Sequence, residues 1–163
     1  MLKIKIDQKL ILIFLFLSSF FALLAAYISQ YVFGLLPCPL CLYQRIPFFM
    51  VIFITLFAFL SKQSPERQKI IIKIALFILI INAILALYHV GVEQKIFIFD
   101  KCSDLSAGAD NLQDLKQQIL QIPAVRCDTP QFILFGISMA GWNVIYCLGI
   151  VLAAVILPRI FAK

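Results

Sequence analysis

The sequence predicts an all-α membrane protein, a four-transmembrane-helix bundle, and two observations support this fold class. The 163-residue chain is 63% hydrophobic and only 13% charged, whereas soluble domains are about half apolar and about a quarter charged. Its apolar residues also form four blocks, each near or above the ~20 residues that a helix needs to cross a bilayer. An ordinary soluble enzyme, a disordered tail and a nucleic-acid-binding domain are excluded. We expect one integral membrane domain over residues 1–163.

The four apolar blocks define the expected spans. These are residues 10–28, 42–60, 70–88 and 132–157. They are apolar on every face, which argues against the alternating pattern of a membrane β-barrel. The first block could also be a cleaved signal peptide, because three lysines precede it. Its apolar run is too long for a signal-peptide core and no clear cleavage site follows, so we expect a retained helix.

Basic residues gather on one side of the expected bundle. Loop 29–41 has no lysine or arginine, and the long loop 90–131 has few for its length. By the positive-inside rule, both termini and the short 61–69 connection should be cytoplasmic and the two loops should lie outside. The basic residues that set this orientation are Lys3, Lys5, Lys9, Lys62, Arg67, Lys69, Arg159 and Lys163.

The long outer loop is expected to contain a short amphipathic helix over residues 111–122. Pro123 would end this helix. The helix could lie flat on the outer leaflet or pack on the mouth of the bundle, and the sequence leaves both open. Its apolar side chains recur at spacings of three and four: Leu112, Leu115, Ile119 and Ile122.

The most informative motif lies at the start of the second span. Cys38 and Cys41 have the Cys-x-x-Cys spacing that is usual for thiol–disulfide exchange. Pro39 suits a first helical turn, which would place Cys41 where helix N–H groups favour a thiolate. Arg45, four residues on, would project from the same face and stabilise that thiolate further. The alternative is that Arg45 extends to lipid phosphates.

These residues resemble the disulfide bond formation protein B (DsbB) family. Residues 38–45 read Cys-Pro-Leu-Cys-Leu-Tyr-Gln-Arg, and residues 88–93 at the end of the third span read Tyr-His-Val-Gly-Val-Glu. The outer loop that follows holds a second cysteine pair, Cys102 and Cys127. The resemblance extends into residues 132–143 and covers nearly the whole chain. The joint pattern is specific, whereas a Cys-x-x-Cys alone would be a weak signal.

The resemblance implies a membrane thiol:quinone oxidoreductase of the bacterial inner membrane. It would reoxidise a soluble periplasmic DsbA-like protein by passing electrons through two cysteine pairs to a membrane quinone. Cys102 would receive the attack of the partner's thiolate, and Cys127 would then exchange with Cys38. Cys41 would remain as the thiolate that acts on the quinone. The sequence does not choose between ubiquinone and menaquinone.

Two further residues are implied in quinone binding. Arg45 would hold a quinone oxygen and stabilise the negative charge that develops during reduction. His89, the single histidine, would hydrogen-bond the quinone ring or pass protons. The alternative for His89 is an interface anchor without chemistry. Gln44 and Glu93 are weaker candidates for the same polar pocket.

The remaining polar or small residues of the spans are expected to serve packing. Asn82 should bond another helix, and Trp142 should pack inside the bundle. Cys147 should be inert, because apolar surroundings disfavour a thiolate. Several small residues of the fourth span should allow close helix approach: Gly136, Ser138, Ala140, Gly141 and Gly149.

Three other functions are less consistent with the sequence. A quinone-linked oxidase similar to the vitamin K epoxide reductase family would carry its Cys-x-x-Cys toward the end of the helical core. A metal-binding protein would usually have two closely spaced ligand pairs, whereas Cys102 and Cys127 are far apart in the sequence. A structural membrane subunit would leave Arg45 beside Cys41 unexplained. We therefore expect no metal site.

Overall fold

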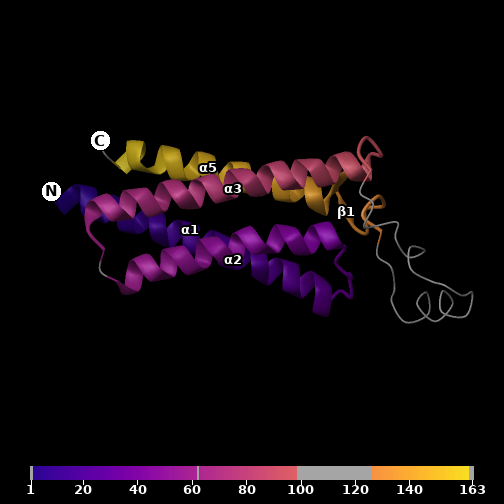
Figure 1. Cartoon of the computed structure of the whole chain (residues 1–163), viewed down its shortest axis with the longest axis horizontal. Helices are drawn as coiled ribbons and strands as arrows, with labels where there is room; N and C mark the ends of the chain where they lie inside the picture. The colour runs from indigo at the N-terminus through magenta and orange to yellow at the C-terminus, as the bar shows by residue number, and fades with distance from the viewer. Residues whose placement is uncertain (1, 62, 99–125, 162–163) are drawn as a thin grey trace, which may run out of the picture.

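The computed structural model describes residues 2–61, 63–98 and 126–161, and it confirms the four-helix architecture. Within these ranges, four helices are long and apolar enough to cross a membrane. The described start of α1, the described end of α5 and the α2–α3 connection lie at the same end of the bundle (Figure 1). The four helices are α1 (Leu2–Tyr31), α2 (Pro39–Leu60), α3 (Pro65–Glu93) and α5 (Met139–Phe161).

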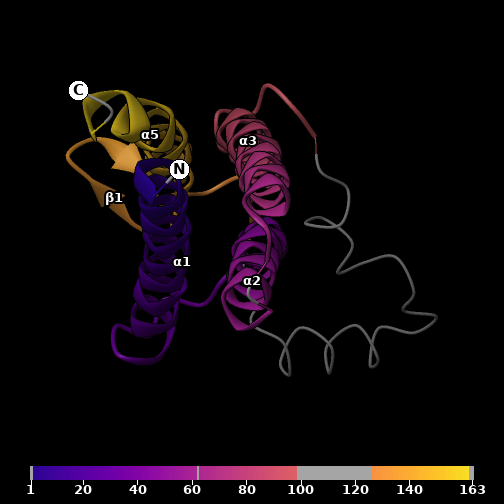
Figure 2. The same ribbon diagram turned by 90° about the vertical axis from the view of Figure 1, so that its left-hand side faces the viewer.

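The helices form a closed four-cornered arrangement (Figure 2). α2 packs against both α1 and α3, and α5 completes the bundle by packing against α3 and, less extensively, α1. Each helix contacts its neighbours along one side, so it buries one stripe and presents the rest of its surface outward.

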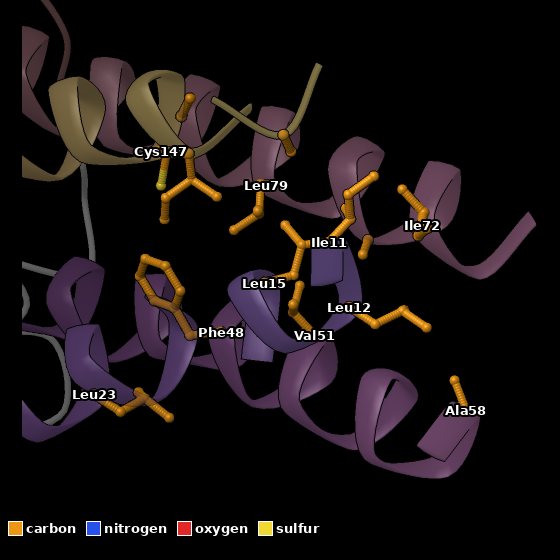
Figure 3. Close-up of a cluster of buried hydrophobic side chains, with 14 residues drawn as sticks. Ile11, Leu12, Leu15, Leu23, Phe48, Val51, Ala58, Ile72, Leu79 and Cys147 are labelled. Carbon is orange, nitrogen blue, oxygen red and sulfur yellow. The ribbon is translucent and has the colours of Figure 1, made fainter. Parts of the chain in front are cut away.

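Buried side chains from all four helices meet along the bundle axis (Figure 3). Leu15, Val51 and Leu79 have no exposed surface. Large apolar side chains such as Phe53 and Phe77 are instead exposed on the outside, which is the distribution expected of a bundle that faces lipid. The core therefore occupies the bundle axis, and the outer surface matches hydrocarbon.

The chain enters the last helix through a β-hairpin. Strand β1 (Ile133–Leu134) pairs antiparallel with β2 (Ile137–Ser138). Phe135 and Gly136 have φ values of 54° and 79°, and two positive φ values are what a type I′ two-residue turn requires. Gly136 therefore serves this turn, and the expectation that it allows close helix packing was wrong.

The prediction that the fourth helix begins at Phe132 was wrong. The helix begins at Met139, and Ser138 Oγ accepts a hydrogen bond from Gly141 N at 3.2 Å. The segment that precedes it is apolar whether it forms a strand or a helix, so hydropathy alone does not separate the two. The helix expected at residues 111–122, and Cys102, lie outside the described residues.

Candidate active site

Cys38 lies at the N-terminus of α2 as its N-cap. Its backbone is extended, with φ −72° and ψ 165°, and its sulfur accepts a hydrogen bond from Cys41 N at 3.3 Å. Pro39 occupies the first turn of the helix, as predicted. Sequence reasoning assigned the benefit of the helix N-terminus to Cys41, whereas the structure directs the N–H group to the sulfur of Cys38. The N-cap residue precedes the first helical turn, so its side chain can accept hydrogen bonds from the free N–H groups of that turn.

Cys38 is buried among groups that stabilise negative charge on sulfur. Its Sγ lies 3.1 Å from Cys41 Sγ and 3.5 Å from His89 Nε2. The hydrogen bond with the Cys41 thiol, and secondarily contact with His89, lowers the pKa of Cys38, although burial opposes this. Both cysteines are free thiols. The geometry therefore favours a thiolate at Cys38 when the pair is reduced.

His89 connects Cys38 to polar groups from three helices. Gln44 Nε2 lies 2.9 Å from His89 Nδ1, and Glu93 Oε1 lies 3.9 Å from His89 Nε2. Asn143 Nδ2 donates to Gln44 Oε1 at 2.7 Å. The sequence suggested Gln44 and Glu93 as companions of His89, and the structure brings both to it. Asn143 was missed, because nothing in the sequence signals that α5 approaches this point.

Cys127 reaches the Cys38–Cys41 motif from the segment that precedes the hairpin. It is buried and disulfide-bonded. Its Sγ, Cys38 Sγ and a ring nitrogen of His89 all lie within 4.8 Å of one another. This cluster has the residue types of a metal site, but a disulfide sulfur lacks the thiolate that a metal requires. The same proximity suits exchange between two cysteine pairs.

Arg126 and Asp128 flank Cys127 and form an exposed ion pair. Arg126 Nε and Nη2 donate to the two carboxylate oxygens of Asp128 at 2.9 and 2.6 Å. The hydrogen bonds from the Arg126 guanidinium lower the pKa of Asp128, although desolvation opposes this. This two-pronged pairing holds the chain on both sides of Cys127.

Arg45 is held by the end of α1. Its Nη1 donates to Gln30 Oε1 at 2.7 Å, and its guanidinium carbon lies 4.9 Å from the centroid of the Tyr27 ring. Tyr27 and Gln30 are three residues apart, so they share a helix face. Neither residue was predicted from the sequence to contact Arg45. Their three-residue spacing near the end of the first span was the signal that could have pointed to them. These contacts preorganise the Arg45 guanidinium.

A cavity of about 450 Å³ lies between the helices at this end of the bundle. Its walls are mostly apolar, and Cys41, Arg45 and His89 line it together. That combination of size, apolar wall and a few polar groups is typical of a small-molecule site. Trp142, which was expected to pack inside the bundle, lines the cavity instead and donates through Nε1 to Leu134 O at 3.1 Å.

Comparison with known proteins identifies the family. The model of the family described as "Disulfide bond formation protein DsbB" matches residues 8–157. This chain belongs to the DsbB family. Disulfide bond formation protein B 1 of Pseudomonas putida is 30% identical over 138 residues, which cover 79% of this chain and 75% of that protein. The protein of the same name from Pseudomonas entomophila is 29% identical over the same length, with the same coverage.

A relative without an assigned function is also similar. Uncharacterized protein RP370 of Rickettsia prowazekii is 35% identical over 146 residues, covering 87% of this chain and 83% of that protein. No solved structure matches the chain. DsbB-family membership makes the chain a multi-pass bacterial membrane protein of disulfide bond formation, and it confirms the resemblance found in the sequence.

Asn82 of this DsbB-family chain bonds another helix, as predicted. Asn82 Nδ2 donates to Cys147 Sγ at 3.5 Å, which joins α3 to α5. Cys147 itself has no exposed surface. Neither residue lines the cavity.

Proposed function

We propose that this DsbB-family protein is a thiol:quinone oxidoreductase that reoxidises a soluble periplasmic DsbA-like dithiol protein. One observation carries the proposal. Cys127 Sγ lies within 4.8 Å of Cys38 Sγ, at the edge of a cavity lined by Cys41 and Arg45. Two cysteine pairs beside a small-molecule cavity form a route by which electrons pass from a soluble protein into the membrane.

The cysteine pairs exchange disulfides in sequence. The partner's thiolate attacks Cys102, which forms a mixed disulfide and releases Cys127 as a thiolate. Cys127 then attacks Cys38 and breaks the Cys38–Cys41 bond, so that Cys41 leaves as a thiolate. The partner's second thiolate attacks its own sulfur in the mixed disulfide, which frees Cys102 and leaves the partner oxidised. Cys102 next attacks Cys127, which restores the loop disulfide and reduces Cys38.

The residues of the cavity suit a quinone headgroup. A quinone bound there would accept two electrons and two protons, which allows the Cys38–Cys41 disulfide to form again. An arginine has five N–H donors, and the bond of Arg45 to Gln30 uses one of them. Arg45 would donate to a quinone oxygen, and the apolar walls would exclude water. DsbA-type oxidases have potentials of about −120 mV, so reoxidation needs a strong terminal acceptor.

The proposed orientation puts both termini in the cytoplasm and the cysteine pairs on the periplasmic side. The basic residues near the ends of the spans support it through the positive-inside rule. This orientation also places the cysteine pairs in an oxidising compartment, because disulfides persist in the bacterial periplasm.

The decisive experiment uses purified protein, a reduced DsbA-like partner and either ubiquinone or menaquinone. We expect quinone absorbance to change as the partner is oxidised, and Cys41→Ser to abolish this change. Cys102→Ala should block oxidation of the partner while leaving the reaction of reduced Cys38 and Cys41 with quinone intact. Stoichiometric bound zinc, with no response to quinone, would instead establish a metal protein.

A further inference from the structure

A continuous line of side-chain hydrogen bonds crosses the bundle and ends at Cys38. At its far end Asn82 Nδ2 donates to Cys147 Sγ, and the Cys147 thiol donates to Asn143 Oδ1, both at 3.5 Å. Asn143 Nδ2 then donates to Gln44 Oε1 at 2.7 Å. Gln44 Nε2 lies 2.9 Å from His89 Nδ1. Side chains from α2, α3 and α5 are thus joined in one chain of donors and acceptors.

The direction of this chain determines the protonation of His89. An amide accepts through its oxygen and donates through its nitrogen. Because Asn143 donates to the oxygen of Gln44, the amino group of Gln44 faces His89 Nδ1. Two N–H donors cannot share a hydrogen bond, so Nδ1 must be unprotonated. In a neutral imidazole the proton then lies on Nε2.

The groups around Nε2 favour the same protonation. Cys38 Sγ lies 3.5 Å from it and already accepts the N–H of Cys41. The carboxylate of Glu93, which has acceptors only when it is ionised, lies 3.9 Å from Nε2. If the chain ran in reverse, Nε2 would be bare and would face this carboxylate. With the hydrogen bonds in the observed direction, Asn82 Oδ1 is buried without a partner. If every bond ran the other way, the Asn82 amide would be turned over. Its amino group, which has two N–H donors, would then occupy that buried position in place of the oxygen.

We propose that Gln44, oriented by Asn143, is a positioning residue that holds His89 in its Nε2–H tautomer, so that the imidazole donates a hydrogen bond to the sulfur of Cys38. His89 thereby acts toward Cys38 as a donor that stabilises the thiolate, and not as a base that removes its proton. This inference deepens the proposed function and depends on it only for its role in electron transfer. The tautomer can be measured without quinone or a partner.

The single histidine makes the tautomer directly measurable. We would label the full-length reduced protein with ¹⁵N-histidine, using an affinity tag without histidine, and record both ring nitrogens. Wild type should show a proton on Nε2 and a bare Nδ1. Gln44→Glu replaces the donor with an acceptor, so Nδ1 should become protonated. Gln44→Leu should abolish the preference and give both tautomers.

Gln68→Leu is the matched control, because Gln68 is another buried glutamine and lies at the opposite end of α3. It should leave the tautomer of His89 as in wild type. A protonated Nδ1 in wild type, or an unchanged tautomer in both Gln44 variants that keep their helical circular dichroism, would overturn the proposal.

A second readout follows the Cys38 thiolate by its ultraviolet absorbance as pH is varied. Cys41, Glu93, Arg45 and Arg126 line the same cavity, and Gln44→Leu changes none of their charges. Loss of the fixed donor should shift the Cys38 midpoint to higher pH in Gln44→Leu, while Gln68→Leu leaves it in place. An unchanged midpoint in Gln44→Leu would contradict the role assigned to His89. If the tautomer and midpoint behave as expected but quinone is not reduced, the proposed function is wrong and this positioning role stands.

Discussion

Cys38 combines three features that act on one sulfur atom. It caps the positive end of α2, it contacts Cys41, and it faces His89. Each of these interactions is stronger when the sulfur is negatively charged. The reduced site therefore holds its negative charge on Cys38, whose sulfur lies within 4.8 Å of Cys127 Sγ.

The lowered pKa of Cys38 predicts how stability depends on pH. The unfolded chain binds more protons than the folded one at pH values between the lowered folded pKa and the ordinary thiol pKa of about 8.5. The stability of reduced protein should therefore rise with pH through this window and fall as pH drops through the folded pKa. The measurement is the thermal midpoint of reduced wild type relative to Cys38→Ser at each pH. A difference that does not vary with pH would contradict the prediction.

Arg45 tests the binding role of the cavity. Arg45→Ala should raise the KM for quinone about tenfold to hundredfold, because a hydrogen bond to a charged group contributes about 1.5–3 kcal/mol. Steady-state kinetics at several quinone concentrations measures this effect. Arg67→Ala is the control, because Arg67 lies in the first turn of α3 and bonds only Gln63 among the described residues. An equal change in both variants would show that the effect is not local.

The β-hairpin before α5 is the element that hydropathy did not reveal. It places Trp142 in the first turn of α5, where Trp142 Nε1 bonds the hairpin at Leu134 O. Had the helix begun at Phe132, Trp142 would lie deep in the span. The late start of α5 therefore makes this side chain part of the cavity wall.

Backbone conformation predicts opposite effects for substitutions of two glycines, one in the hairpin turn and one inside α5. Gly136→Ala should destabilise the protein by about 1 kcal/mol, because φ is +79° at this position. Gly149→Ala should be neutral or stabilising by up to about 1 kcal/mol, because an added Cβ there meets no atom within 4 Å and alanine favours helix. Thermal unfolding in detergent compares the two. Equal effects would show that the turn conformation is not the cause.

At the scale of the whole molecule, all described components of the site lie at one end of the bundle. The described start of α1 and the described end of α5 lie at the opposite end of the bundle (Figure 1). The bundle therefore separates the cysteine chemistry from the termini by the length of its helices.

This arrangement predicts the location of the termini in the cell. Green fluorescent protein fused after Lys163 should fluoresce, and alkaline phosphatase fused there should be inactive, because the proposed orientation leaves the C-terminus in the cytoplasm. Alkaline phosphatase inserted in the 90–131 loop should be active. The reverse pattern would place the cysteine pairs in the cytoplasm and contradict the proposed function.

Features that depend on residues close together in the chain could be predicted from the sequence. Span length follows from local hydropathy, and the start of α2 follows from Pro39 beside Cys38. For these reasons the four helices and the Cys-x-x-Cys motif at the N-terminus of α2 were predictable.

Contacts between side chains of different helices could not be predicted from the sequence. Asn143 and Gln44 are 99 positions apart, and Arg45 finds Gln30 and Tyr27 on a different helix. Such contacts depend on how each helix is rotated about its axis, which is set by the packing of all four helices together. In spans that are apolar on every face, the sequence carries little information about that rotation. The hydrogen bonds that position His89 therefore emerged only from the assembled bundle.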